Sequence, residues 1–140
     1  MRGATLLELL SVVVIICIVT AIALPPLRRQ MDAAAVHAAA DRYATLHEAA
    51  RRLAVARGRL VRLTVDTARS EATIALRQGG GWDTVRTWAL GEARLGTSQP
   101  VMAFAPTGLG FGLSNSRLVF TMGAAAETLT VSRTGRLKRW

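Results

Sequence analysis

Cysteine and histidine are scarce in this 140-residue chain. A single cysteine, Cys17, excludes a disulfide within the chain, and residues 58–140 contain neither cysteine nor histidine. An enzyme needs a nucleophile, a base or a set of metal ligands, and that region offers neither residue type for these roles. The two histidines, His37 and His47, are ten positions apart without a third nearby ligand, so we interpret them as structural or solvated. We therefore expect no catalytic site, no small-molecule substrate, no metal and no cofactor.

Acidic residues are also few, nine against 18 basic ones, and the formal net charge is +9. Such a balance is typical of proteins that bind an anionic partner such as nucleic acid or lipid headgroups. A codon bias toward arginine and alanine explains the composition equally well. The carboxylates of the C-terminal region fall among turns and strand ends, where we expect them to be solvated. They are Asp66, Glu71, Asp83, Glu92 and Glu127.

Charge is absent from a long apolar run between Leu9 and Leu27. At about 1.5 Å per residue, a helix of this length crosses a hydrocarbon core of about 30 Å. The run therefore predicts a membrane-spanning helix. A secretory signal peptide is the alternative, because residues 21–23 resemble a small-residue cleavage site. Two features count against it: the run is longer than the usual apolar region of about 7–15 residues, and Glu8 stands where that region should begin.

Pro25 and Pro26 predict a break in this helix. Each ring removes a backbone donor and clashes with the carbonyl four residues earlier, so the helix should kink or open near Ala21. A helical pattern resumes over residues 28–57, where apolar residues recur at three- and four-residue spacing, and Gly58 is a natural C-terminal stop. The apolar face of this amphipathic helix comprises Val36, Ala40, Tyr43, Leu46, Ala50, Leu53 and Ala54.

The period changes from helical to two after Gly58. Val61, Leu63 and Val65 alternate with polar residues, which is typical of a half-buried strand. We predict an α+β chain in which a long N-terminal helix packs on a C-terminal antiparallel β-sheet domain, residues 58–140. The expected strands cover residues 60–66, 72–77, 84–90, 101–105, 117–122 and 128–132, with a short last strand that ends at Trp140.

The N-terminal segment Gly3-Ala4-Thr5-Leu6-Leu7-Glu8, followed by an apolar helix and Pro25, resembles the class III leader of type IV pilins and pseudopilins. The resemblance implies that a prepilin peptidase cuts between Gly3 and Ala4 and methylates the new N-terminus. Residues 1–3 would then be the leader and residues 4–27 the transmembrane and assembly helix. Glu8 matches the glutamate of the family and Pro25 its helix-breaking proline. Ala4 stands where the family usually has phenylalanine or methionine.

The position of Glu8 has a physical explanation within this resemblance. A charged side chain at the centre of a bilayer costs about 2.5–3.5 kcal/mol on insertion scales, so such residues usually have a partner. The α-amine freed at Ala4 is a cation, and Glu8 of an adjacent subunit lies in the same low-dielectric layer. Pairing between subunits would compensate both charges, and we interpret Glu8 as an assembly contact. The alternative is a glutamate that reaches the headgroups without a partner.

The rest of the chain is similar to the GspH/FimT group of minor pseudopilins, on residues 104–108 (FAPTG) and on the ending at residues 129–137 (LTVSRTGRL). The resemblance implies a structural subunit of a type II secretion pseudopilus or a type IV pilus, acting in assembly initiation or at the tip. Its partners would be other pilins or pseudopilins, the prepilin peptidase and the inner-membrane assembly platform. The chain would cross the bacterial inner membrane once, with a cytoplasmic N-terminus and a periplasmic β domain.

Binding of nucleic acid is an alternative function, because some FimT-like proteins take part in DNA uptake through a basic C-terminal tail. Arg136, Lys138 and Arg139 could neutralise phosphates while Trp140 stacks on a base. Solvated residues of an edge strand explain the same side chains, because basic residues there deter aggregation. A second basic group offers a competing location and comprises Arg51, Arg52, Arg57, Arg59 and Arg62.

Overall fold

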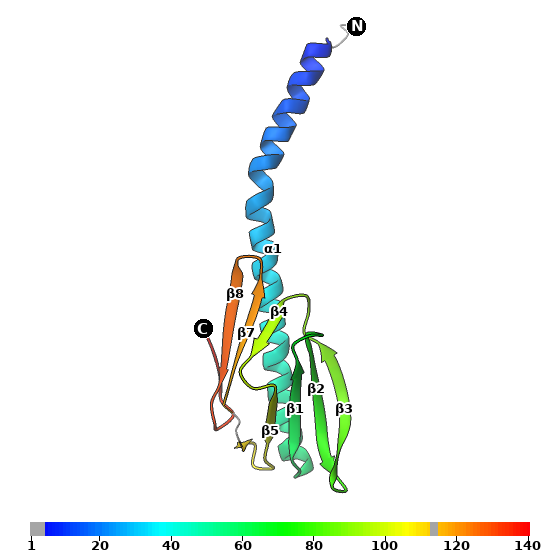
Figure 1. Cartoon of the computed structure of the whole chain (residues 1–140), viewed down its shortest axis with the longest axis vertical. Helices are drawn as coiled ribbons and strands as arrows, with labels where there is room; N and C mark the ends of the chain where they lie inside the picture. The colour runs from blue at the N-terminus through cyan, green and yellow to red at the C-terminus, as the bar shows by residue number, and fades with distance from the viewer. Residues whose placement is uncertain (1–4, 113–114) are drawn as a thin grey trace.

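The computed structural model describes residues 5–112 and 115–140 and confirms the α+β fold. A long helix, α1 (Leu6–Arg57), precedes the β domain, as Figure 1 shows. The predicted processing residues Gly3 and Ala4 lie outside the described residues. The strands are β1 (Val61–Asp66), β2 (Glu71–Gln78), β3 (Gly81–Ala89), β4 (Arg94–Thr97), β5 (Val101–Phe104), β6 (Gly110–Phe111), β7 (Ser116–Met122), β8 (Ala125–Val131) and β9 (Leu137–Arg139).

Both ends of α1 carry capping residues that the local sequence explains. At the start, the Thr5 hydroxyl accepts a hydrogen bond from the backbone N–H of Glu8, which satisfies one of the free donors of the first turn. At the end, Gly58 adopts a left-handed conformation with φ of 57°. Glycine reaches this conformation without the steric cost of a Cβ atom, so it ends the helix as the sequence predicts.

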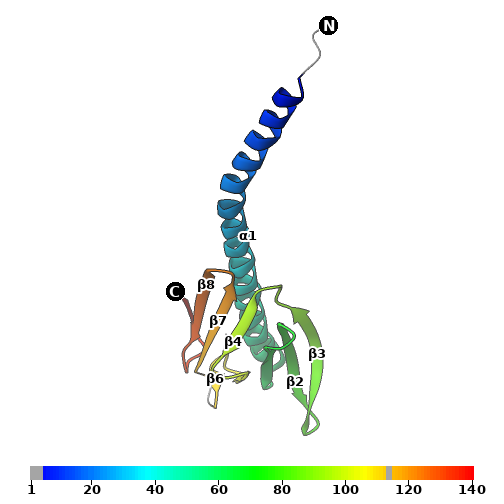
Figure 2. The ribbon, with the colours of Figure 1, turned by 45° about the horizontal axis from the view of Figure 1, so that its top comes forward.

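The helix runs through Pro25 and Pro26 without interruption, so it does not open there, and of the two predicted outcomes only a bend is compatible with α1. The two prolines still remove the backbone donors that would bond the carbonyls of Ala21 and Ile22. A gentle bend can relieve the clash of a proline ring without ending the helix. Figure 2 shows α1 curving between its free N-terminal half and the half that packs on the β domain. Residues 4–27 and 28–57, predicted as separate segments, therefore share one helix over their described residues.

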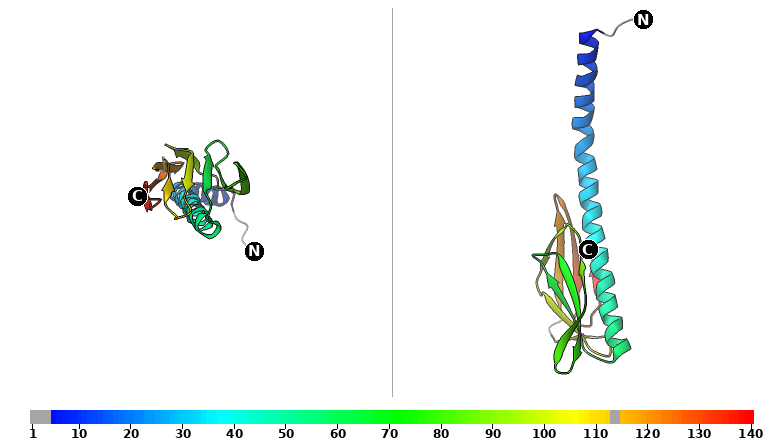
Figure 3. Two further views of the ribbon diagram at one scale, coloured as in Figure 1. Left: turned by 90° about the horizontal axis from the view of Figure 1, so that it is seen from below. Right: turned by 90° about the vertical axis from the view of Figure 1, so that its right-hand side faces the viewer.

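The strands form two antiparallel sheets on the same side of the C-terminal half of α1 (Figure 3). The five-stranded sheet has the order β3-β2-β1-β5-β6, and the four-stranded sheet has the order β4-β7-β8-β9. The first contacts α1 through β1, β2 and β5, and the second through β7 and β8. Because neighbouring strands are antiparallel, short turns suffice to join most of them.

The core lies between α1 and the inner faces of both sheets. The predicted apolar face of the helix is confirmed, with Leu53 half-buried and its other members buried. The alternation at the start of the β domain is confirmed as well, since Val61, Leu63 and Val65 are buried. Tyr43, Phe104 and Phe120 are among the largest fully buried side chains. Burial of a large apolar side chain contributes about 1.5–3 kcal/mol, so the interface between α1 and the two sheets stabilises the domain.

Two strands were not predicted, and the reason is local. β4 and β6 are short, and each contains a glycine, which weakens strand propensity. β4 forms because Leu95 pairs with Phe120 of β7 and is buried in the core. The formation of β4 and β6 therefore depends on tertiary packing, whereas the alternation of apolar and polar residues predicts the longer strands.

In the turn between β7 and β8, a side chain at position 123 would displace the carboxyl group of Asp32 on α1. Gly123 has φ of 55°, and a Cβ atom there would overlap the carboxyl group of Asp32 on α1. Gly79 has almost the same φ, 56°, with open space around its Cβ position, and so provides a matched control. We expect Gly79→Ala to cost about 1 kcal/mol for backbone strain alone, and Gly123→Ala to cost about 2 kcal/mol.

Chemical denaturation of the full chain in non-ionic detergent, followed by circular dichroism, measures both costs. In an Asp32→Ala background, the excess cost of Gly123→Ala over Gly79→Ala should disappear, because the overlapping carboxyl group is gone. Equal costs for the two glycine variants in the wild-type background would contradict the close approach of this turn to the helix.

Candidate functional site

The N-terminal half of α1 projects from the β domain as a free apolar rod (Figure 1). Every residue from Thr5 to Met31 is exposed, including large aliphatic side chains along its whole length. Within the described residues, α1 is the helix that is long and apolar enough to cross a membrane, with a mean hydropathy of 2.8 in its most apolar window. An apolar surface of this extent needs a cover of lipid or of other protein.

Ser11 and Thr20, the two hydroxyl side chains inside the apolar run, bond the helix backbone. The Ser11 hydroxyl donates to the carbonyl of Glu8 at 2.7 Å, and the Thr20 hydroxyl donates to the carbonyl of Ile16 at 2.7 Å. Such bonds to the preceding turn allow serine and threonine to lie in an apolar environment. These two residues therefore require no external partner.

Glu8 differs from these hydroxyl side chains. It lies exposed in the first turn of α1, where the helix dipole favours a negative charge. None of the ion pairs of the described residues includes its carboxylate. The geometry leaves this carboxylate at the free end of the rod, available to a cation from outside the described part of the chain.

The C-terminal basic residues form an ordered edge strand. β9 pairs with β8, with Lys138 opposite Thr130, and so forms the short last strand that the sequence predicts. The backbone N–H of Arg136 donates to the Ser132 hydroxyl at 3.1 Å, and the Trp140 indole donates to the Thr130 hydroxyl at 3.1 Å. These bonds hold the last residues against the four-stranded sheet.

Arg139, one of the three candidate DNA-binding residues, forms ion pairs with acidic residues of the chain itself. Its guanidinium group forms ion pairs with Glu127 of β8 and with Asp41 of α1, the latter at 2.7 Å. These hydrogen bonds raise the pKa of Arg139 above its ordinary value. Arg139 therefore links the last strand to the helix, and it lies apart from the groups that face solvent on β9.

Glu127 is buried, with only 4% of its side chain exposed, so the expectation that it is solvated is wrong. The register of β8 turns Glu127 toward the helix, where Nδ1 of His37 lies 2.5 Å from its Oε2 atom. A buried carboxylate is tolerated when charged or hydrogen-bonding groups surround it. His37, Asp41, Glu127 and Arg139 thus form one polar cluster between α1, β8 and β9.

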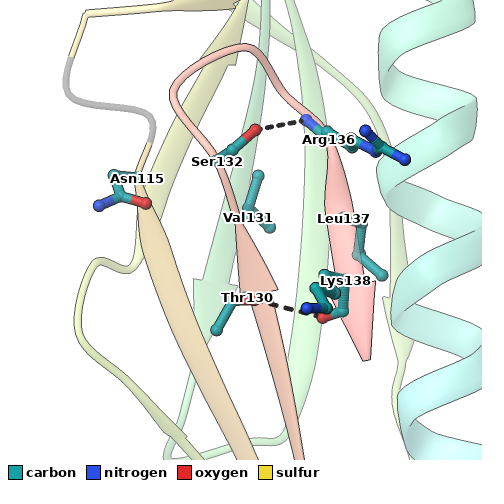
Figure 4. A pocket seen from close by; sticks show the side chains of 7 residues that line it. All are labelled: Asn115, Thr130, Val131, Ser132, Arg136, Leu137 and Lys138. Carbon is teal, nitrogen blue, oxygen red and sulfur yellow. Dashed lines mark hydrogen bonds between the residues drawn. The ribbon is translucent and has the colours of Figure 1, made fainter. Parts of the chain in front are cut away.

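Arg136 and Lys138 remain on the outside of β9. Together with Asn115, Thr130 and Ser132 they line a cleft of about 520 Å³, which Figure 4 shows. The row of side chains continues across the sheet, because Thr130 lies opposite both Lys138 and Arg117 of β7. Cations and hydroxyl groups in such a row can bind an anion through charge and hydrogen bonds.

Trp140 extends the same surface and is 69% exposed. The ammonium group of Lys138 lies 3.6 Å from the centre of its ring, within cation–π range. An exposed indole beside cations is the arrangement on which bases of single-stranded nucleic acid stack.

His47 of α1 is buried in the core. Its ring meets the ring of Phe104 edge-on at a centroid distance of 5.0 Å and also lies near Tyr43. Burial lowers the pKa of His47 to about 4, with smaller contributions from Glu48, which raises it, and Arg51, which lowers it. No hydrogen-bond partner for its Nε2 atom lies within the described residues. His47 is therefore a neutral core residue at physiological pH, in agreement with its structural interpretation.

No protein-family model and no curated protein matches the chain. Solved structures do match. The type IV minor pilin FimU of Pseudomonas aeruginosa, in one crystal form, has a TM-score of 0.64 and 16% identity, over 83% of this chain and 92% of that one. A second crystal form of FimU has a TM-score of 0.61 and 15% identity, over 74% and 91%.

The minor pseudopilin EpsH from the type 2 secretion system of Vibrio cholerae also matches. Its TM-score is 0.61 with 16% identity, over 76% of this chain and 95% of that one. At these identities the similarity establishes the fold alone. The chain therefore shares with these two proteins a long N-terminal helix packed on antiparallel sheets.

Proposed function

We propose that the chain is a minor pilin or pseudopilin of the GspH/FimT type, a structural subunit of a type II secretion pseudopilus or a type IV pilus. The observation that supports this most is the free apolar half of α1, which is continuous with the half that holds the β domain. Lipid would cover this rod before assembly, and helices of other subunits would cover it afterwards. The folds of FimU and EpsH agree with such a subunit.

The proposal includes a topology and a set of partners. The N-terminus is cytoplasmic, α1 crosses the inner membrane once, and the β domain is periplasmic. A prepilin peptidase removes residues 1–3 and methylates Ala4, and the inner-membrane platform inserts the subunit among other pilins or pseudopilins. A position in assembly initiation or at the tip is part of the proposal. No enzymatic activity and no cofactor are required of the chain in this role.

The N-terminus of the mature protein tests this proposal. We expect mass spectrometry of the protein from its own host to show a chain that begins at Ala4 and carries one methyl group. A Gly3→Val variant should keep Met1, because the peptidase requires a small residue before the cut. A mature chain with Met1 intact, or one that begins near Leu24, would contradict the proposal, the second outcome indicating a secretory signal peptide instead.

DNA binding at the C-terminal edge is a second candidate function, and one observation favours it. Arg117, Thr130 and Lys138 form a row beside the exposed Trp140 ring, which together offer cations for phosphates and a platform for a base. Binding would be sensitive to salt and indifferent to sequence, because no base edge is read.

Gel retardation of a single-stranded oligonucleotide by the full chain in non-ionic detergent tests this candidate. We expect the double variant Arg136→Ala/Lys138→Ala to weaken binding about tenfold at low salt. The matched control Arg52→Ala/Arg57→Ala removes the same charge from two exposed positions of the second basic group and should have little effect. Arg139 is unsuitable for this test, because it holds the fold through Glu127. Absence of retardation at low salt by the wild-type chain would reject DNA binding.

A further inference from the structure

Two arginines and a tryptophan form a cluster on the face of the five-stranded sheet that is turned away from α1. Trp82 lies on β3, directly opposite Arg77 of β2. The central guanidinium carbons of Arg62 and Arg77 lie 4.5 Å and 5.6 Å from the centre of the Trp82 ring. Because Arg62 belongs to β1, its side chain reaches across β2 toward the free edge of the sheet at β3.

Within residues 5–112 and 115–140, no ion pair neutralises this cluster. Among the described residues, the ion pairs include neither Arg62 nor Arg77. The Nε atom of Arg62 is buried without a hydrogen-bond partner in the same part of the chain. An unsatisfied buried donor costs about 1–3 kcal/mol, and a guanidinium group stacked on an aromatic ring keeps its N–H groups free for a carboxylate. The buried Nε atom of Arg62 is out of reach of solvent, so the donors that remain for a carboxylate from outside are the terminal N–H groups of the two guanidinium groups.

β3 beside the cluster is a free sheet edge. It pairs with β2 alone among the described strands, so the backbone groups on its other side have no partner strand. A bulge interrupts the pairing, because Thr84 lies opposite Ala75 whereas Arg86 lies opposite Ile74. The regular stretch from Gly81 to Thr84 ends at this bulge and includes Trp82. A strand added here would place alternate side chains on the same face as the indole and the two guanidinium groups.

We propose that the Arg62–Arg77–Trp82 cluster and the adjoining edge of β3 bind an extended acidic segment of another protein. The peptide adds to β3 as a strand, and carboxylates at alternate positions face the two guanidinium groups. Positive charge continues beyond the cluster, since Arg77 also lines a cleft of about 470 Å³ with Arg59. An acidic peptide that is longer than the Gly81–Thr84 edge would therefore still lie near arginine side chains.

Two other occupants fit the cluster less well. A second copy of this chain carries the same net charge of +9, and none of its nine acidic residues lies two positions from another. It therefore cannot supply carboxylates on alternate positions of a strand. Single-stranded nucleic acid binds by stacking bases on exposed rings, whereas the Trp82 ring is half-buried and already has two guanidinium groups over it.

Fluorescence anisotropy tests this proposal with a labelled peptide of alternating threonine and glutamate, added to the purified full chain in non-ionic detergent at low salt. We expect Arg62→Ala/Arg77→Ala to weaken binding about tenfold or more, the value expected for the loss of two charge-assisted contacts. The matched control Arg69→Ala/Arg94→Ala removes the same charge from two exposed positions of the β domain that belong to neither proposed binding site, and it should change binding little. If the first double variant folds poorly, the single variant Arg77→Gln gives the same comparison, because its side chain is exposed.

A peptide that is N-methylated at alternate amides tests strand addition, since it keeps the charge but loses backbone donors. It should bind about tenfold more weakly than the unmodified peptide. Three results would overturn the proposal: no binding of the acidic peptide by the wild-type chain, equal losses in the two double variants, or binding that N-methylation leaves unchanged. Stronger binding of oligothymidine than of the peptide at the same arginines would also overturn it and would identify a nucleic-acid site. The assay needs no filament, so its outcome is independent of the proposed role in assembly.

Discussion

Replacement of Glu8 by alanine is expected to leave the chain in the membrane but to exclude it from filaments. The variant makes the free half of α1 more apolar, so insertion into lipid should be at least as favourable. In the assembled state, however, the α-amine of a neighbouring subunit would lose its counter-charge in a layer of low dielectric constant. Leaving one partner of a buried ion pair alone costs about 3–5 kcal/mol, and each 1.4 kcal/mol corresponds to about tenfold in an equilibrium.

Co-isolation with sheared filaments measures this effect. The amount of Glu8→Ala protein in the filament fraction, relative to the membrane fraction, should fall by about a hundredfold or more. Ser11→Ala is the matched control, because Ser11 lies one turn further along the same exposed helix and bonds only the backbone carbonyl of Glu8. Unchanged co-isolation of Glu8→Ala would reject the pairing and would favour a glutamate that only reaches the headgroups.

The second large effect concerns pH. The pKa of His47 is lowered by burial from 6.5 to about 4, so the unfolded chain takes up a proton at a higher pH than the folded chain. Stability from the neutral ring is therefore fully present above pH 6.5 and is lost as the pH falls toward 4. The loss from this group should reach about 3 kcal/mol at the lower value, because one pKa unit corresponds to about 1.4 kcal/mol.

A His47→Leu variant should remove this dependence. Leucine has a similar volume and leaves no unsatisfied ring nitrogen, so the variant should be as stable as the wild-type chain at neutral pH, or more stable. Denaturation of both chains in detergent at several pH values between neutrality and pH 4 measures the difference. His37→Gln controls for the other histidine, an exposed residue that pairs with the buried Glu127 carboxylate. The same fall in stability with pH in wild-type and His47→Leu chains would show that another group carries the dependence.

The sequence predicts those features that depend on neighbours along the chain. The apolar face from Val36 to Ala54, the stop at Gly58 and the alternation that begins at Val61 each follow from local spacing, and the structure confirms them. Pro25 and Pro26 do not end the helix, because together they remove only two backbone hydrogen bonds while the rest of the 52-residue helix sustains the helical path.

Contacts between distant elements could not be predicted in the same way. Arg139 and Asp41 are 98 positions apart, and His37 and Glu127 are 90 apart. Their meeting depends on the register of β8 and on the docking of that strand against α1, and neither is encoded in local periodicity. For this reason the C-terminal basic residues divide into Arg139, which holds the fold, and Arg136 and Lys138, which face solvent. The proposed role of Glu8 requires a second subunit, and the proposal rests on the resemblance of the leader.

The continuity of α1 also has a mechanical consequence. With 52 residues at about 1.5 Å each, the helix is a rod of about 80 Å, and its far end forms the spine of the β domain. A pulling force applied at the N-terminal end of α1 is transmitted along the helix to the β domain. It then acts parallel to the interface between the helix and the two sheets. Many side chains between Val36 and Ala54 then resist this shear force together. A force applied to a sheet edge would instead separate the strands one at a time. We therefore expect the chain to resist traction along its own axis better than force applied to a sheet edge.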